Sequence, residues 1–186
     1  DRSVSRGLGD VYKRQDIETD FTAEEIVMTG RTPYQGRFEG TSIGDKEAVY
    51  RAFSLTKADK LKDKKFAILS GGEKQKIVIA RAVAQTTPWM LLDEPIASLD
   101  IKNQIEIMQT LSELNRQEGV SVLMVLHDIN LAGIYCDRLI MLKDGQVIAA
   151  GNTNECLCEE NLKKLYDISF FHMDTKKGQR YYYAEI

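Results

Sequence analysis

The sequence predicts an α/β fold with a mainly parallel sheet flanked by helices and a separate helical subdomain. Three observations lead to this prediction. Residues 22–68 form a mainly helical block, in which apolar residues at helical spacing are interrupted by glycine-rich breaks. Beyond that block, apolar runs typical of buried strands alternate with helical segments, the pattern of a parallel sheet. Finally, 43% of the 186 residues are apolar, enough to bury a substantial core.

Charge and cysteine content narrow the possible functions. The chain has 25 basic and 28 acidic residues, a net charge of −3 and no basic block, so no nucleic-acid partner is expected. Its three cysteines favour a reducing compartment, and Cys156-Leu-Cys158 is predicted to be inert rather than a metal site. No apolar run approaches the ~20 residues that span a bilayer. The chain is expected in the cytosol or at a membrane surface.

The helical block begins with a capping box. Thr22 is followed three residues later by Glu25, so a helix is expected to start near Thr22 and continue through Met28. A second helix is predicted around residues 45–53, where four apolar positions share helical spacing: Ala48, Val49, Ala52 and Phe53.

The segment LSGGEKQ, residues 69–75, introduces the next helix and is called the signature segment below. Ser70 is suited to cap a helix whose apolar face is predicted to contain Ile77, Ile79, Ala80 and Val83. Glycines let a backbone approach a ligand closely, and a helix N-terminus presents free N–H groups to an anion. Ser-Gly-Gly alone is more typical of an ordinary turn into a buried helix, whereas the longer string favours phosphate binding.

The next element is WMLLDEP, residues 89–95, which is predicted to be a buried strand ending in Asp93 and Glu94. Ligands bind beyond the carboxyl ends of parallel strands, and two carboxylates at that edge need a counter-ion. Mg²⁺ held through Asp93 and a water activated by Glu94 satisfy this need, with Pro95 turning the chain away. The alternative is a solvated turn at a strand end.

A second apolar strand, residues 120–126, is predicted to bring His127 to the same edge of the sheet as Asp93. There His127 can donate a hydrogen bond to a phosphate; the alternative is a satisfied turn residue. The helix between the two strands should end at Gly119. Its predicted buried face consists of Ile101, Ile105, Met108, Leu111 and Leu114.

The C-terminal third is predicted to be structural. RLIMLKDGQVIAAG reads as a hairpin, because Asp144-Gly145 suits the positive φ of a two-residue connection. A helix is expected around residues 159–168. A last strand is expected near residues 180–186, with tyrosines that cover the core.

Four motifs, LSGGEKQ, LLDEP, SLD and LHD, occur in this order, and over roughly residues 21–160 the chain resembles the ATP-binding cassette (ABC) ATPases. The resemblance implies the P-loop NTPase fold of that family. It also implies ATP and Mg²⁺ as cofactors and a homodimer of ATPase subunits that sandwiches two ATP molecules.

The resemblance assigns roles to the signature segment first. Ser70, Gly71 and Gly72 are expected to contact the γ-phosphate of a nucleotide held by the partner subunit, and Gln75 belongs to the same nucleotide-binding set. Lys74 stands where the family often has arginine, which keeps the charge but loses the planar fork.

The other motifs receive hydrolytic and signalling roles by the same resemblance. Asp93 is expected to coordinate Mg²⁺ through water, Glu94 to act as the general base and His127 to hold the γ-phosphate. Asp100 is expected to signal across the dimer.

The segment FTAEEIVMTGRTPYQGRF is similar to the ATPases of importers for ferric siderophores, haem or cobalamin. Those proteins carry a Gly-Arg-x-Pro-aromatic stretch near the surface that docks on the transmembrane permease subunits. Arg31, Tyr34 and Phe38 are therefore permease-contact candidates, and the alternative is that Arg31 and Tyr34 only cap a helix end. The resemblance also implies a peripheral place at the cytoplasmic face of the membrane and an indirect partner, a periplasmic or extracellular substrate-binding protein.

No G-x-x-x-x-G-K-[ST] phosphate loop occurs in the 186 residues. In ABC ATPases this loop lies further upstream of the signature than the 68 residues that precede it here, so an N-terminally truncated protein is expected. Residues 5–15, SRGLGDVYKRQ, resemble the in-frame translation of a transposon-type sequencing adapter. Gln15 is therefore not expected to be the family's magnesium-sensing glutamine. A natural, polar N-terminus is the alternative.

The expected organisation has four parts: residues 1–15 as an artefact or a disordered segment, 16–68 as the helical subdomain and its entry, 69–160 as the signature helix and catalytic α/β core, and 161–186 as a C-terminal helix and strand. The expected function is the nucleotide-binding subunit of an ABC importer that couples ATP hydrolysis to uptake, with this chain inactive by itself. One alternative is a non-transporter ABC ATPase of DNA repair or translation, although its usual coiled-coil insertion is missing between the signature and His127. The other alternative is a non-catalytic fragment.

Overall fold

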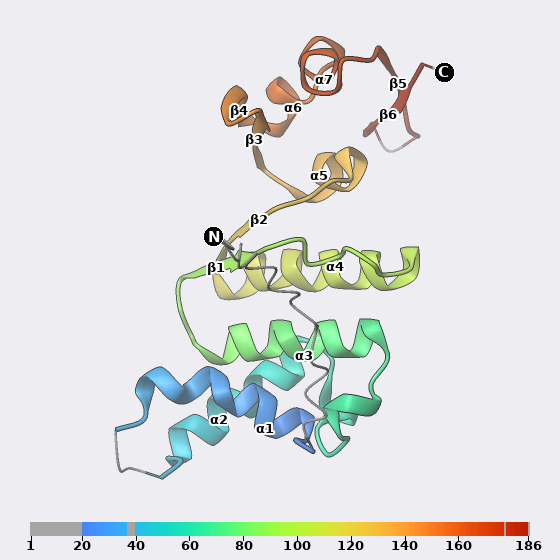
Figure 1. Ribbon diagram of the computed structural model, residues 1–186. Coiled ribbons are helices and arrows are strands. Elements are labelled where there is room, and N and C mark those ends of the chain that lie inside the picture. Colours follow the sequence, from blue (N-terminus) through green and yellow to red (C-terminus); the bar gives the residue numbers. More distant parts are fainter. Residues whose placement is uncertain (1–19, 37–39, 177, 186) are drawn as a thin grey trace, which may run out of the picture.

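The computed structural model describes residues 20–36, 40–176 and 178–185, and its elements stack in sequence order (Figure 1). In that view residues 20–84 form the lowest tier, residues 89–124 the middle tier and residues 129–185 the upper tier. The predictions about residues 1–15, including Gln15, and about Phe38 lie outside the described residues.

The lowest tier is helical, as predicted. It contains α1 (Ala23–Met28), the 3-10 helix η1 (Thr29–Tyr34), α2 (Ile43–Leu55), the short 3-10 helices η2 (Asp59–Leu61) and η3 (Phe66–Ile68), and α3 (Gly71–Ala84). The capping box that starts α1 is confirmed. The Glu25 N–H donates to the Thr22 hydroxyl at 3.2 Å, and the Thr22 N–H donates to the Glu25 carboxylate at 2.7 Å.

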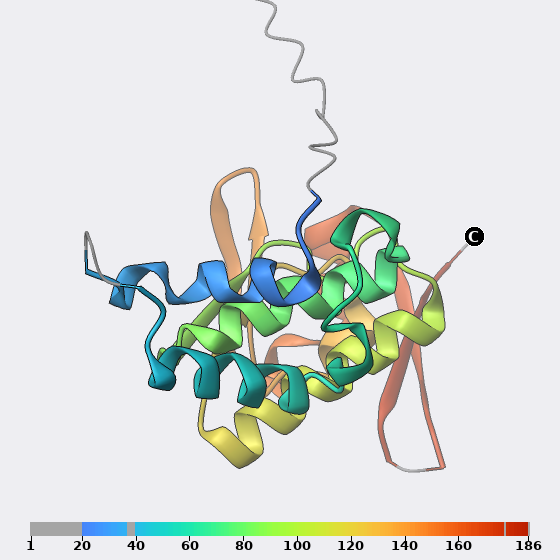
Figure 2. The same cartoon turned by 90° about the horizontal axis from the view of Figure 1, so that it is seen from below.

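The helix α3 lies between two hydrophobic cores. On one face, Ile77, Ala80 and Ala84 are fully buried against α1 and α2 (Figure 2). On another face, Ile79 is fully buried in a second core that includes the helix of residues 101–118. A helix that is apolar on two sides needs two partners, so the position of α3 is fixed by the lowest and the middle tier together.

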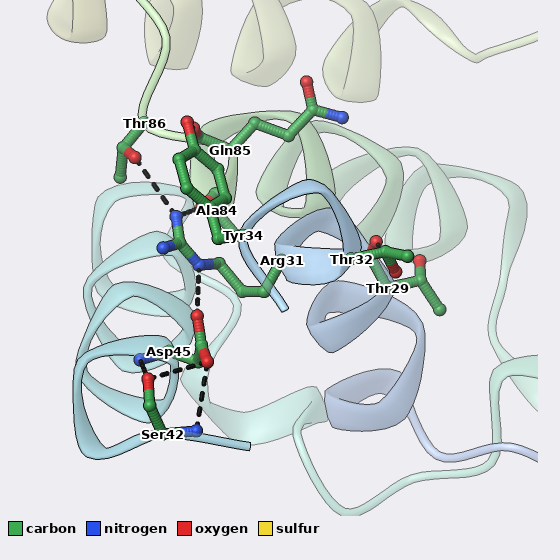
Figure 3. Close-up of polar contacts among 9 residues, drawn as sticks. All are labelled: Thr29, Arg31, Thr32, Tyr34, Ser42, Asp45, Ala84, Gln85 and Thr86. Carbon is green, nitrogen blue, oxygen red and sulfur yellow. Dashed lines mark hydrogen bonds and ion pairs between the residues drawn. The ribbon is translucent and has the colours of Figure 1, made fainter. Parts of the chain in front are cut away.

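The C-terminus of α3 is fastened to the other helices of the lowest tier by Arg31 (Figure 3). Its side chain is 11% exposed and donates from Nε to Asp45 Oδ1 at 2.9 Å. Nη1 donates to the Ala84 carbonyl at 2.8 Å and to the Thr86 hydroxyl at 3.1 Å, and the guanidinium lies 3.9 Å from the Tyr34 ring centroid. The last carbonyl groups of a helix have no partner within it, so Arg31 supplies a partner and joins η1, α2 and α3.

The guanidinium of Arg31 is buried and caps a helix end, which is the feature that the alternative interpretation predicts for this residue. Tyr34 both caps the end of α3 and lies at the surface. Its hydroxyl donates to the Gln85 carbonyl at 2.6 Å, and the residue is 51% exposed. Tyr34 remains a candidate for a surface contact.

Asp45 completes this network at the start of α2. Its carboxylate accepts hydrogen bonds from the Ser42 hydroxyl at 2.7 Å and the Ser42 N–H at 3.0 Å, besides the one from Arg31. Hydrogen bonding by Ser42, and then by Arg31, lowers the pKa of Asp45. A carboxylate with a lowered folded-state pKa stabilises the fold above its ordinary pKa, and this contribution disappears as the pH falls through the lowered pKa.

The middle tier contains β1 (Trp89–Leu92), α4 (Ile101–Glu118) and β2 (Ser121–Met124). The two strands pair in parallel, with Trp89 opposite Ser121. The prediction that β1 is a buried strand is wrong for Trp89 and Leu91, which are 60% and 72% exposed, while Met90 is buried. Side chains alternate along a strand, and within the described residues only the face toward α4 is covered.

The helix α4 ends at Gly119 as predicted, with φ of 68°, but its buried face is rotated from the predicted one. Ile101 is 75% and Ile105 37% exposed. The side chains that α4 buries completely or nearly so are those of Ile107, Met108, Thr110, Leu111 and Leu114. At about 100° per residue, Ile101 and Ile105 lie roughly 110° and 150° around the helix from the centre of this stripe, which places both outside it.

The upper tier contains α5 (Ile129–Tyr135), β3 (Arg138–Lys143), β4 (Gln146–Asn152), α6 (Thr153–Cys156), α7 (Glu159–Tyr166), β5 (Phe170–Asp174) and β6 (Arg180–Ala184). The predicted hairpin is confirmed: β3 and β4 are antiparallel, and Asp144 and Gly145 have φ of 50° and 76°.

The last two strands also form an antiparallel pair, in which β5 was not predicted. The described strands therefore make three separate pairs, and the parallel arrangement is restricted to β1 and β2. Short connections join antiparallel strands only, which explains the two hairpins. In β6 only Tyr182 is buried, whereas Tyr181 and Tyr183 are 48% and 45% exposed, so the expectation that the tyrosines cover the core applies to Tyr182.

Removal of the Arg31 side chain should destabilise the fold much more than removal of an exposed arginine. Arg31→Ala leaves the Asp45 carboxylate and the Ala84 carbonyl without their partner, and we expect Tm to fall by roughly 5–15 °C. In the matched control, Arg51→Ala removes an ion pair with Glu118 in which Arg51 is 62% exposed, and Tm should fall by less than about 2 °C. Thermal unfolding followed by circular dichroism compares the two; equal shifts contradict the role assigned to Arg31.

Candidate functional site

The two parallel strands bring a carboxylate and an imidazole together. Asp93 and Glu94 follow β1 and His127 follows β2, and the carboxyl ends of parallel strands meet at one edge. His127 Nε2 lies 2.8 Å from Glu94 Oε1, with side chains 74% and 47% exposed. The prediction that His127 shares an edge of the sheet with the acidic pair is confirmed.

Glu94 occupies an unusual backbone conformation. Its φ is 45°, in the left-handed region that residues other than glycine rarely adopt. The following turn is closed by the Ala97 N–H, which donates to the Glu94 carbonyl at 3.1 Å. Strained backbone gathers at functional sites, where the surrounding fold maintains it. The conformation of Glu94 is therefore consistent with a role for this residue in chemistry.

Asp93 is an exposed carboxylate beside Glu94. No group of three His, Cys, Asp or Glu side chains in the described part of the chain could hold a metal ion alone. Mg²⁺ is usually held by one or two carboxylates together with substrate phosphates and waters, and it needs no all-protein cage. An exposed carboxylate at this edge, such as that of Asp93, has the chemistry that such an ion requires of the protein.

The signature segment forms the start of α3. The Glu73 N–H donates to the Ser70 hydroxyl at 3.3 Å, and the Ser70 N–H donates to the Glu73 carboxylate at 2.9 Å, so the predicted cap is confirmed. The hydrogen bonds from Ser70 lower the pKa of Glu73. Ser70 and Gly71 are exposed, whereas Gly72 is buried.

The next residues of the signature segment, Lys74 and Gln75, are half-buried on the first turns of α3. The Lys74 ammonium lies 5.8 Å from the Phe66 ring centroid, within the range of a cation–π contact. Lys74, which stands where the family often has arginine, therefore has a defined neighbour beside the helix start.

Asp100 caps α4. Its Oδ1 accepts a hydrogen bond from the Asn103 N–H at 2.8 Å, and its Oδ2 accepts one from Asn103 Nδ2 at 2.8 Å. Hydrogen bonding by Asn103 lowers the pKa of Asp100. Sequence reasoning missed Asn103, although side chains three residues apart on a helix are close enough for an amide to bond a carboxylate.

The predicted site residues thus form two groups. Ser70, Gly71 and Gly72 lie beside the Asp100 turn where α3 meets α4, and a Cβ added to Gly71 would lie 3.8 Å from the Leu99 side chain. Glu94 and His127 form the second group at the end of the strands. Within the described residues no hydrogen bond or ion pair joins the two groups.

Three comparisons define the class of protein. The family profile described as "ABC transporter" matches residues 1–97. The chain is 38% identical over 173 residues to the ferric enterobactin transport ATP-binding protein FepC of Escherichia coli strain K12, covering 93% of this chain and 64% of FepC. It is structurally similar to a metal-chelate type ABC transporter in an inward-facing conformation, with a TM-score of 0.84 and 26% identity over 90% of this chain and 68% of that one.

A dimeric ATP-binding cassette in a post-hydrolysis state, bound to ADP and Pi, is also similar. Its TM-score is 0.59 and its identity 33%, over 72% of this chain and 57% of that chain. These structures confirm the predicted P-loop NTPase fold of ABC ATPases. The chain belongs to the ABC transporter family.

The chain matches only part of the length of its relatives. It spans just under two thirds of the length of FepC. Among the described helices, none combines the length and the apolar character needed to cross a membrane.

Relief of the strain at Glu94 should leave the fold as stable as before or more stable. Glycine adopts positive φ without steric cost, and the exposed Glu94–His127 contact contributes little, so Glu94→Gly should change Tm by about 0 to +4 °C. Asp93 has no positive φ. Asp93→Gly is the matched control and should lower Tm by about 1–4 °C, because it only adds freedom to the unfolded chain. Calorimetry that gives Glu94→Gly the lower Tm of the two contradicts the argument from strain.

Proposed function

We propose that the chain is part of the nucleotide-binding subunit of an ABC importer, and that it carries the signature helix and the hydrolytic residues. The observation that carries this proposal is the Glu94–His127 pair, held at the carboxyl ends of two parallel strands in a member of the ABC transporter family. The exposed N-terminus of α3, with Ser70 and Gly71 at the surface, supports it.

Each residue at the strand ends has a chemical task in this proposal. Glu94 accepts a proton from the attacking water, and His127 donates a hydrogen bond to the γ-phosphate of ATP. Asp93 holds Mg²⁺ through water, and the ion supplies positive charge to the phosphate oxygens. His127 must leave its contact with Glu94 to reach a phosphate. Because both side chains are well exposed, this exchange costs little.

The signature segment acts toward a second subunit in this proposal. Ser70 and Gly71 present hydroxyl and backbone N–H groups to the γ-phosphate of ATP bound in the partner, at the positive end of the α3 dipole. Gly72 and Gln75 shape the same helix start, and Asp100 lies beside it on α4. The dimeric cassette bound to ADP and Pi supports a homodimer of this kind.

The proposed cargo is a ferric siderophore, haem or cobalamin. FepC is a ferric enterobactin transport protein, and the similar solved structure is of metal-chelate type. The subunit would then work at the cytoplasmic face of the membrane against transmembrane permease subunits, and a substrate-binding protein would act on it only through them. Tyr34 is the candidate for a permease contact, since half of it is exposed on the lowest tier.

The role of Glu94 is tested in the complete open reading frame that contains these residues. Glu94→Gln should leave ATP binding intact and reduce hydrolysis by about 10²–10⁴-fold, the usual loss of a general base. Bound ATP should then hold the dimer together. Turnover and size-exclusion chromatography with ATP and Mg²⁺ measure both effects, and near-normal turnover excludes Glu94 as the base.

The 186-residue chain itself should show no Mg²⁺-dependent ATPase activity above background. The backbone N–H groups and the lysine of a G-x-x-x-x-G-K-[ST] loop supply most of the phosphate affinity in such ATPases, and this sequence contains no such loop. Phosphate release is measured for this chain and, as the positive control, for a related ATP-binding cassette whose sequence contains such a loop. Robust turnover by the short chain contradicts the proposed dependence on that loop.

A further inference from the structure

Asn103, in the first turn of α4, connects two motifs that are separate in the sequence. On one side it holds both carboxylate oxygens of Asp100, one through its backbone N–H and one through Nδ2, each at 2.8 Å. The carboxylate therefore has a single orientation relative to α4. An Asp at this position needs only the backbone bond to cap the helix, so the side-chain bond is an additional constraint.

The other side of the Asn103 carboxamide lies against Gly72. A Cβ on Gly72 would lie 2.4 Å from Asn103 Oδ1, 2.5 Å from Cγ and 2.9 Å from Nδ2, closer than real atoms approach. A Cβ on Gly71 would meet only the Leu99 side chain, at an ordinary 3.8 Å. A side chain at position 72 would therefore force the Asn103 carboxamide out of its place beside Asp100.

A second contact continues this junction one turn further along both helices. Lys76 Nζ lies 2.7 Å from Glu106 Oε2, and these side chains are only 21% and 35% exposed. Lys76 is four residues after Gly72 on α3, and Glu106 is three residues after Asn103 on α4, so the two contacts join the same faces of the two helices. The start of α3 cannot move relative to the start of α4 without breaking these contacts.

We propose that Asn103 is a positioning residue that holds the signature turn and Asp100 at a fixed spacing. The carboxamide acts as a spacer against Gly72 and as a clamp on Asp100, so that Ser70, Gly71 and Asp100 meet a partner subunit as one surface. Asn103 itself contacts no nucleotide. The inference rests on the proposed function, in which these residues act across a dimer.

The contact is tested first in the 186-residue chain, by a thermal double-mutant cycle of Gly72→Ala and Asn103→Ala. In the wild-type background the added methyl group displaces the carboxamide, and Tm should fall by on the order of 2–6 °C. In the Asn103→Ala background the space is free, and the helix propensity of alanine should raise Tm by about 1–3 °C. Gly71→Ala is the matched control and should have the same effect in both backgrounds. An equal effect of Gly72→Ala in both backgrounds overturns the spacer contact.

The positioning role is tested in the complete open reading frame, with ATP and Mg²⁺, well below every variant's Tm. Asn103→Ala should leave the KM for ATP within about 2-fold, while kcat and ATP-driven dimerisation fall by about 10–100-fold, because misplaced groups lose rate rather than ground-state binding. Gly72→Ala should produce the same loss, and the double variant no further loss, because both break one link. Lys102→Ala, at a side chain that is 84% exposed, is the control and should behave as wild type.

The outcomes separate the inference from the proposed function. If the wild-type protein hydrolyses ATP and dimerises while Asn103→Ala matches it in kcat and dimerisation, only the positioning role is overturned. A rise in the KM for ATP that accounts for the whole loss of kcat/KM also overturns the positioning role, because a residue that contacts the nucleotide gives that pattern. If the wild-type protein neither hydrolyses ATP nor dimerises, the proposed function and the positioning role fall together, and the thermal cycle still decides the contact.

Discussion

The burial of α3 between two cores is the constraint on which the other elements depend. Ile77 on one face and Ile79 on another are both fully buried, so the helix cannot rotate or slide without exposing apolar surface. Arg31 adds a polar constraint at the C-terminal end, where a buried guanidinium without its partners would be very costly. The start of α3, where the signature segment lies, is therefore placed by contacts that are far from it.

Two further elements take their position from α3. At its N-terminal end, the carboxamide of Asn103 sets the distance to α4, and Asp100 is oriented by the same side chain. At its C-terminal end, only four residues separate α3 from β1. The hydrogen bond from Arg31 to Thr86 in this connection therefore also limits the position of the strand. The strand in turn delivers Glu94 to the edge where His127 arrives from β2. One helix thus relates the two groups of candidate site residues, between which the described part of the chain has no hydrogen bond or ion pair.

Features encoded by neighbouring residues could be predicted from the sequence, and features that depend on distant partners could not. The capping boxes at Thr22 and Ser70 and the hairpin turn at Asp144-Gly145 need only a few adjacent residues, and each is confirmed. The Glu94–His127 pair was also accessible, because parallel strands place their ends together. The burial of Arg31 could not be predicted, because its three hydrogen-bond acceptors are 14, 53 and 55 residues away in the sequence. The exposure of Leu91 could not be predicted either, because an apolar run does not reveal which face of a strand is covered.

The distribution of burial separates the residues that hold the structure from those proposed to act. The residues that hold the structure are buried and contact other residues of the chain: Arg31 bonds Asp45, and Gly72 lies against Asn103. Ser70, Gly71, Glu94 and His127 are exposed. An exposed Glu–His contact contributes little stability and can be exchanged for a contact with phosphate at small cost, whereas the buried network resists any change. Such a division suits a surface that must keep its shape while its outer side chains change partners, as the proposed association with a second subunit would require.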